Sequence, residues 1–209
     1  PEIAPEDLVV IAVPVFAGRV PPLAIERLWQ IESHGARCAV AVVYGNRAYD
    51  DALLELHDVA AELGFRVIAA IGAVAEHSII RKYGQGRPDA ADEKTLRDFG
   101  KQIAQKAASG NDQAPAVPGK RPYKKPMAGP HPKANSNCNG CGICANACPT
   151  GAISPSNPKQ TDTQKCISCM KCEAACPSGA RGIGKVMAFL IAQMIKKPCA
   201  SRKENELYI

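Results

Sequence analysis

A cysteine run that occurs twice constrains this chain more than any other feature. Residues 138–153 read CNGCGICANACPTGAI, and residues 166–181 read CISCMKCEAACPSGAR, with 8 of 16 positions identical. The second copy lies 28 residues after the first, and the two hold eight of the ten cysteines in a 209-residue chain. Such clustering indicates a local site built from cysteines, because a disulfide framework spreads its cysteines along the chain.

The spacing within each copy is Cys-x2-Cys-x2-Cys-x3-Cys-Pro. This spacing is typical of bacterial proteins that hold two iron–sulfur clusters, in which the fourth cysteine of each run binds the other cluster. The ligands expected for a first [4Fe–4S] cluster are Cys138, Cys141, Cys144 and Cys176. Those expected for a second are Cys166, Cys169, Cys172 and Cys148.

Backbone geometry gives a physical reason for the spacing. Three thiolates of one short loop reach three irons only if the backbone wraps closely around the cluster, and Gly140 and Gly142 permit this in the first copy. A structural zinc site is one alternative, but it uses two Cys-x2-Cys pairs. A disulfide scaffold is another, but it needs an oxidising compartment. Neither accounts for a doubled four-cysteine run with a trailing proline.

Charge is distributed unevenly along the chain. Residues 1–110 hold 12 Lys and Arg against 15 Asp and Glu, whereas residues 111–209 hold 14 against 5. A basic half suggests a nucleic acid or an anionic surface, but no helix-turn-helix or RNA-binding signature accompanies it. Ligating thiolates offset part of this positive charge. No nucleic-acid partner is therefore expected, and no apolar run reaches the ~18–20 residues of a membrane span.

Before the cysteine runs, strand and helix patterns alternate. Continuous apolar runs predict strands buried on both faces at 8–15, 36–44 and 65–71, and Cys38 is expected to be a buried apolar side chain within one of them. Apolar residues at helical spacing predict helices at 24–31, 53–63 and 96–107. Asp50 and Asp92 are the expected N-caps of the last two helices. The alternation predicts an α/β domain with a parallel sheet.

Composition divides the chain into four segments. Prolines and glycines between residues 109 and 137 exclude a regular helix there and indicate a semi-rigid linker. The expected segments are an α/β domain at 1–110, a Pro/Lys-rich linker at 111–135, a two-cluster domain at 136–182, and a helix and tail at 183–209. That helix carries an apolar stripe of Met187, Leu190, Ile191, Met194 and Ile195, expected to pack on this chain or on a partner. Cys199 is expected to be a free thiol.

Two loops follow the carboxyl ends of predicted strands, where ligands bind in parallel sheets. The loops at 16–21 and 45–49 each combine glycine with an aromatic ring. From the residues alone, an ordinary tight turn with a surface aromatic is the favoured interpretation of each loop. His77, beyond the third predicted strand, is a lone histidine, and such residues are more often structural than catalytic.

Further segments outside the cysteine runs carry a resemblance to a known family. They are PVFAGRVP (14–21), VVYGNRAYDDALLEL (42–56), AEHS (75–78), GRPD (86–89), VPGKRPY (117–123) and RKENELYI (202–209). Residues 134–182 resemble a bacterial 2[4Fe–4S] ferredoxin. With these segments added, the chain resembles the EFR1-type fusion proteins, in which a flavodoxin-like domain precedes a ferredoxin.

The resemblance implies an FMN site. The family's loops beside the flavin ring map to Phe16, Ala17, Gly18, Arg19, Tyr44, Gly45, Asn46, Arg47 and Tyr49. The strand at 8–15 matches the family's third strand, so the first two strands and the phosphate loop are expected to be missing from a chain that begins at Pro1. This implies an N-terminally truncated flavodoxin-like sheet with the strand at 8–15 on its edge. FMN is expected for the full-length protein, with an incomplete site in this chain.

Electron transfer is the leading functional hypothesis, because a cluster passes single electrons and a flavin exchanges both one and two. The expected partners are redox proteins that donate and accept electrons. One alternative is an iron–sulfur flavoprotein oxidoreductase that reduces a small substrate, and another is an interaction module or a subunit of a larger redox complex. No catalytic residue is assigned, since no nucleophile and base are paired. The need for reduced thiols during cluster assembly indicates the cytoplasm.

Overall fold

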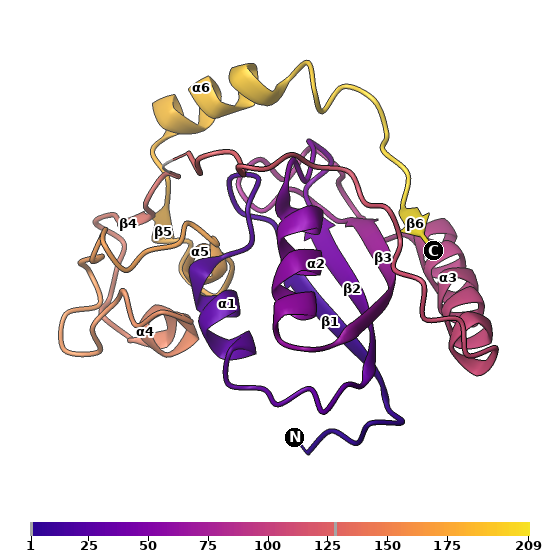
Figure 1. Ribbon diagram of the computed structural model, residues 1–209. Coiled ribbons are helices and arrows are strands. Elements are labelled where there is room, and N and C mark those ends of the chain that lie inside the picture. The colour runs from indigo at the N-terminus through magenta and orange to yellow at the C-terminus, as the bar shows by residue number, and fades with distance from the viewer. Residues whose placement is uncertain (1, 128) are drawn as a thin grey trace. The chain divides into compact units, whose positions relative to one another are not determined.

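The computed structural model describes residues 2–127 and 129–209, and these fall into two compact units (Figure 1). The first unit comprises 2–77, 81–127 and 198–209. The second comprises 78–80 and 129–197. Among the helices described, none combines the length and the apolar character needed to cross a membrane.

A four-stranded sheet forms the centre of the first unit. Strands β1 (Leu8–Pro14), β2 (Arg37–Tyr44) and β3 (Arg66–Val74) are parallel and adjacent in that order. The fourth strand, β6 (Glu206–Tyr208), pairs antiparallel with β3, with Ala70 opposite Tyr208. The mixed α/β class and the three parallel strands confirm the prediction, and β1 lies on the edge of the sheet as the resemblance implied. The returning strand β6 was not predicted.

The helices of the first unit are α1 (Pro22–Leu28), α2 (Ala52–Glu62) and α3 (Ala90–Ala108). Both predicted N-caps are wrong. Asp89 caps α3 by accepting hydrogen bonds from the N–H groups of Ala91 and Asp92, and the Asp92 carboxylate accepts one from the Asp89 N–H. This reciprocal capping box displaces the helix start by one turn. Asp51 holds the N-cap position of α2 and makes no side-chain cap bond.

The sheet is covered on both faces by helices (Figure 1). Alternate residues of β2 divide between the faces, so Val40 packs toward α1 and α2, while Ala39 packs toward α3. An irregularity in the pairing of β2 with β3 places both Ile68 and Ala69 in the cluster on the α3 side. Cys38 is fully buried, as predicted, and burial raises the pKa of its thiol to about 12.

Strand β1 is buried on one face only, which corrects the prediction of two buried faces. Ile11 and Val13 point into the core, each 6% exposed. Leu8 and Val10 alternate with them and are 39% and 64% exposed. The difference follows from the edge position, where the α3 side of the sheet leaves these side chains uncovered.

The proline-rich stretch before residue 127 packs along α2 instead of standing free. A Cβ on Gly119 would lie 2.6 Å from the Leu54 Cβ, so only glycine fits this approach. The side chains of Arg121 and Tyr123 both donate hydrogen bonds to Asp58. Within the described residues 111–127, no helix or strand forms, in keeping with the proline content.

The second unit contains short elements. Strands β4 (Lys133–Ala134) and β5 (Arg181–Gly182) pair antiparallel. Its helices are α4 (Ile143–Ala147), α5 (Lys171–Ala174) and α6 (Lys185–Ile195). The predicted stripe of α6 is not buried as a whole. Ile195 is buried, whereas Met187, Leu190 and Met194 are 49%, 56% and 58% exposed.

Candidate metal centre

The two cysteine runs adopt matching backbone conformations. Each run uses the left-handed region, with φ between 57° and 77°, at three positions that correspond across the 28-residue offset. The pairs are Gly140 with Ser168, Gly142 with Met170, and Gly151 with Gly179. Glycine adopts this conformation freely, whereas other L-residues pay roughly 1–2 kcal/mol. The fold therefore imposes the same wrapped loop on both copies, whether or not glycine is present.

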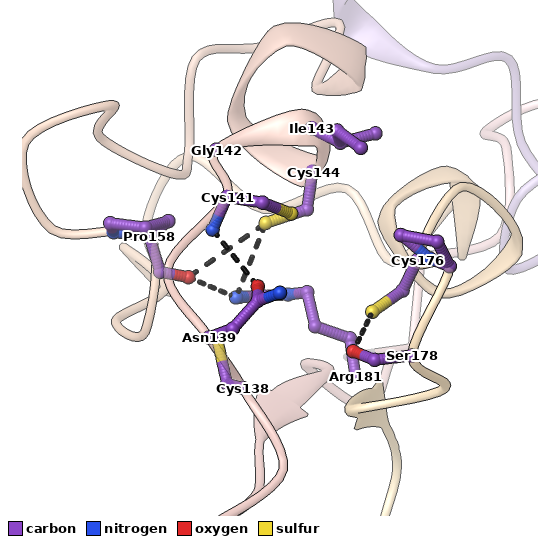
Figure 2. Close-up of a pocket in the computed structure, with 11 residues that line it drawn as sticks. Cys138, Asn139, Cys141, Gly142, Ile143, Cys144, Pro158, Cys176, Ser178 and Arg181 are labelled. Atoms are coloured by element: carbon purple, nitrogen blue, oxygen red, sulfur yellow. Dashed lines mark hydrogen bonds between the residues drawn. The ribbon is translucent and has the colours of Figure 1, made fainter.

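Four of the expected ligands line a single pocket, which Figure 2 shows. Cys138, Cys141 and Cys144 come from the first copy, and Cys176 comes from the second. Helix α4 carries Cys144, which is 7% exposed, while Cys141 is exposed to solvent. The crossed set expected from the spacing is thus brought together around one space, although Cys176 lies 32 positions beyond Cys144 in the chain.

The other four thiols also gather. Burial raises the pKa of Cys166, and the neighbouring thiols of Cys169 and Cys148 act in the same direction. The pKa of Cys172, on α5, is raised by burial and also by Cys169 and Cys166. Cys172 and Cys148 also pack in one buried cluster, so the fourth cysteine of the first copy lies beside a cysteine of the second.

The fourth cysteines have matching hydrogen bonds. The Ala152 N–H donates to the Cys148 sulfur and the Ala180 N–H donates to the Cys176 sulfur, each at 3.3 Å. A hydroxyl two positions after each cysteine lies 3.6 Å from the sulfur. In Cys176 this hydroxyl is the largest cause of a lowered pKa, followed by backbone donors. Both sites thus favour the thiolate, which is the form that binds metal.

Arg181 is a component of the site that sequence reasoning missed. It follows Cys176 by five residues, lines the pocket of Figure 2, and is only 3% exposed. Its Nη1 donates to the Cys144 sulfur at 3.8 Å and to the Pro158 carbonyl. Its Nε is buried and has no hydrogen-bond partner among the described residues. The repeat could have indicated this residue. The equivalent position in the first copy is Ile153, so an arginine in the second copy stands where an apolar side chain is expected.

This donor set fits iron–sulfur clusters. In a cuboidal cluster each of four thiolates binds a different iron, so the sulfurs surround the cluster and do not converge on one point. Among the residues described, no three Cys, His, Asp or Glu side chains converge as the ligands of a single metal ion. Backbone donors aimed at the sulfurs and an orphaned buried N–H at the pocket are the groups that would hydrogen-bond to cluster sulfur.

The first loop implied to contact FMN is a tight turn. Phe16 and Arg19 exchange two backbone hydrogen bonds of 3.1 Å, and Ala17 and Gly18 between them have φ values of 54° and 80°. A Cβ on Gly18 would come within 2.2 Å of the Asp50 carboxylate. The Asp50 side chain therefore fills the space beside Gly18.

In the second loop, Gly45 and Asn46 are used for packing. A Cβ on Gly45 would lie 2.6 Å from the His77 Cα. Asn46 is 4% exposed, and its amide donates to the Ser201 carbonyl at 3.0 Å and accepts from the Lys203 N–H at 3.0 Å. These bonds tie the loop to the C-terminal segment. Burial lowers the pKa of His77.

The tyrosines of the second loop contact β6. The Tyr49 hydroxyl donates to Glu206 at 2.6 Å and lies 2.9 Å from the Tyr208 hydroxyl. The Tyr44 ring meets the Tyr49 ring edge-on, with centroids 5.2 Å apart. Burial, followed by the charge of Glu206, raises the pKa of Tyr44 to about 12.

The arginines of both loops are engaged by carboxylates. Arg19 forms two hydrogen bonds with the buried Glu55, of 2.7 and 2.6 Å, and its guanidinium lies 5.0 Å from the Tyr123 ring centroid. Arg47 pairs with Asp50. The polar groups of these two loops therefore hold the first unit together.

Comparison with known proteins identifies one region. Residues 137–181 match the family described as a 4Fe-4S dicluster domain. No curated protein and no solved structure matches the chain. Because the match spans both cysteine runs, the C-terminal part of the chain is ferredoxin-like and binds iron–sulfur clusters.

Proposed function

We propose that this protein is an electron carrier that holds two [4Fe–4S] clusters in crossed sets. The first set is Cys138, Cys141, Cys144 and Cys176, and the second is Cys166, Cys169, Cys172 and Cys148. The observation that carries the proposal is the gathering of Cys176 with three cysteines of the other copy around one pocket. When bound, each cluster supplies a centre that accepts and releases one electron.

The surrounding residues have supporting roles. The N–H groups of Ala152 and Ala180 donate to ligating sulfurs, which tunes the reduction potential. Cys141 is exposed, so the first cluster has a short path to a redox protein that docks at this surface. Free thiols during cluster assembly require a reducing compartment, and the cytoplasm supplies one.

Anaerobic purification with iron and sulfide counts tests this function. About eight irons per chain are expected, with an EPR signal from two coupled clusters after reduction with dithionite. Cys176→Ser should reduce the iron content and change the signal of one cluster. Cys199→Ser is the control, because Cys199 is a free thiol that lies outside both sets. Two zinc ions and no iron in the wild-type protein would contradict the proposal.

A second, finer proposal is that the first unit couples the clusters to FMN in a longer protein that supplies further strands. The supporting observation is that the loops at 16–20 and 44–49 leave the carboxyl ends of two neighbouring parallel strands, β1 and β2. For the present chain we expect only weak binding, because Asp50 and His77 pack against the loop glycines.

Titration of the chain with FMN, followed by flavin fluorescence, measures this directly. Weak quenching is expected, with little change in Tyr49→Phe, which keeps the ring and removes the hydroxyl bonded to Glu206. Quenching with a submicromolar dissociation constant would show that the site is complete and would overturn the expectation for this chain.

A further inference from the structure

Arg181 is a buried cation whose charge has no carboxylate partner in the part of the chain that the structure describes. In the first unit, the buried Arg87 pairs with the buried Asp92. The partners of Arg181 among the described residues are instead a sulfur, a hydroxyl and carbonyl oxygens. Burial of an unpaired charge is costly, and native proteins avoid it or compensate for it. The compensating charge for Arg181 has therefore to come from something other than a carboxylate, and the sulfur of a cluster ligand is already among its partners.

We propose that Arg181 is the counter-charge of the iron–sulfur clusters and raises their reduction potential. The inference rests on the proposed function, since it requires redox-active clusters on the two cysteine sets. In this role Arg181 is a positioning and tuning residue and ligates no iron. It explains a buried arginine at a place where the first copy of the repeat has isoleucine.

Arg181 contacts the first cysteine set and lies near the second. Its Nη1 lies 3.8 Å from the sulfur of Cys144, a member of the first set. Cys144 belongs to one buried cluster with Cys172 and Cys148, which are members of the second set, so the guanidinium also lies near that set. Its Nε has no partner among the described residues and belongs to a side chain that lines the pocket of the first set, so one donor is available for cluster sulfur.

Three groups hold the guanidinium at this place. The Pro158 carbonyl accepts from Nη1, the Thr161 hydroxyl accepts from Nη2, and the Pro132 carbonyl lies 3.5 Å from Nη2. The backbone of Arg181 is fixed by β5, where it pairs with Ala134 of β4. A side chain held at both ends keeps its charge in one position, so the field at the clusters is constant.

The sign of the effect follows from charge. Reduction adds one electron to a cluster that already carries net negative charge with its thiolates. A nearby buried cation stabilises the reduced form more than the oxidised form, and it does so strongly because little water screens it. Hydrogen bonds to sulfur act in the same direction, and both are known determinants of cluster potential. Removal of the charge should therefore lower the midpoint potential.

The internal repeat supplies the variant that tests this role. Ile153 occupies the equivalent position in the first copy and is 2% exposed, so a buried isoleucine is compatible with this point of the fold. Arg181→Ile makes the two copies alike at this position. Arg181→Gln is a second neutral variant that keeps a hydrogen-bond donor, and Arg181→Lys keeps the charge.

Lys165→Ala is the matched control for net charge. It removes one positive charge next to Cys166, but the Lys165 side chain is 63% exposed and paired with Asp162. Solvent and salt screen such a charge. Its removal should change the reduction equilibrium less than twofold, which separates a local buried charge from the total charge of the protein.

The measurement is an EPR-monitored redox titration of the full chain after anaerobic reconstitution, with iron counted first. Arg181→Ile and Arg181→Gln should make reduction at least about tenfold less favourable, a fall of about 59 mV for a one-electron couple. Arg181→Lys should remain closer to the wild-type potential. A neutral variant with eight irons and an unchanged midpoint would overturn the proposal.

Loss of iron is also informative. If both neutral variants lose iron while Arg181→Lys keeps it, the charge itself retains the clusters, which supports its role as counter-charge. A midpoint of Arg181→Lys far from that of the wild type would then overturn the effect on potential. If all three variants lose iron alike, Arg181 is a structural residue and the proposal is wrong. Wild-type protein without redox-active clusters would instead contradict the proposed function, so the two failures are distinguishable.

Discussion

The two units of this protein are stabilised in different ways. The first has a sheet between helices, and its largest buried side chains, including Leu53, Leu56 and Ile68, are fully enclosed. The main buried cluster of the second contains two cysteines, Cys144 and Cys172, with Ala145 and Ile153. Its helices before α6 have only five and four residues. One unit is thus held by apolar burial, whereas we expect the stability of the other to depend on what its cysteines bind.

Buried charge shows the same contrast. In the first unit Asp92 is 1% exposed, and it accepts hydrogen bonds from Arg87 and Asn205 while Arg202 pairs with it. This network is complete within the polypeptide. In the second unit, none of the carboxylates of residues 129–197 is among the partners of Arg181. The chain therefore neutralises buried charge by itself in one unit and, by our inference, through a cofactor in the other.

Removal of iron by chelation should give the largest effect. We expect residues 129–197 to lose most of their protection from amide exchange, because few apolar contacts replace the clusters. Residues 2–77 should keep their protection, since their core contains no cluster ligand. Hydrogen exchange with mass spectrometry reads both units in one sample. Equal protection of residues 129–197 with and without iron would show that the clusters do not stabilise the second unit.

Asp92→Ala should destabilise the first unit by about 3–5 kcal/mol, because it leaves Arg87 buried without its partner. Denaturant unfolding followed by fluorescence of Trp29, the single tryptophan and a residue of this unit, measures the change. Asp98→Ala is the control, since Asp98 lies on the same helix but forms an exposed pair with Lys101. It should leave the unfolding midpoint unchanged. A loss equal to that of Asp98→Ala would show that the buried pair is not needed.

Leu56→Ala should cost the first unit about 2–5 kcal/mol, since a fully buried leucine leaves a cavity when it is truncated. The matched change in the second unit is Leu190→Ala on α6, where the side chain is 56% exposed. That substitution should cost less than about 0.5 kcal/mol. Unfolding of each unit, followed by tryptophan fluorescence and by cluster absorbance, gives both values. A larger cost at Leu190 would mean that α6 supplies a core.

The same acidic network should make the first unit sensitive to low pH. Its hydrogen bonds, above all that with Arg87, lower the pKa of Asp92 below its ordinary value. A lowered folded-state pKa contributes stability that is fully present above the unfolded value of about 3.9 and is lost as pH falls toward the folded value. Unfolding midpoints measured between neutral pH and pH 3 should fall more steeply for the wild type than for Asp92→Asn. If the unfolding midpoints of the two proteins fell in parallel with pH, Asp92 would not be the source of the sensitivity.

Several features were predictable from sequence because they depend on local pattern. The three parallel strands follow from continuous apolar runs, and the 4Fe-4S character follows from cysteine spacing. Strand β6 was missed because three residues carry too little pattern to predict a strand, and its pairing is set by contacts such as Tyr49 with Glu206, 157 positions apart. Burial of Arg181 was missed for a related reason. An arginine is expected to be exposed when only its residue type is considered. The folded structure shows that Arg181 is buried, at the position that Ile153 occupies in the first copy.

The smallest predicted effect concerns the two left-handed residues that replace glycine in the second copy of the repeat. Ser168 has φ 57° where the first copy has Gly140, and Met170 has φ 59° where the first copy has Gly142. Ser168→Gly should stabilise the cluster-loaded second unit by about 0.5–1 kcal/mol, because it relieves strain at a partly exposed position. Met170→Gly relieves the same strain but removes a side chain that is only 4% exposed. Burial of a methionine contributes about 1.5–3 kcal/mol, and this contribution would be lost. The two variants should therefore shift the midpoint for loss of cluster absorbance in opposite directions. If both variants stabilised the unit, backbone strain alone would determine how the second copy holds its cluster. If both destabilised it, side-chain burial alone would determine it.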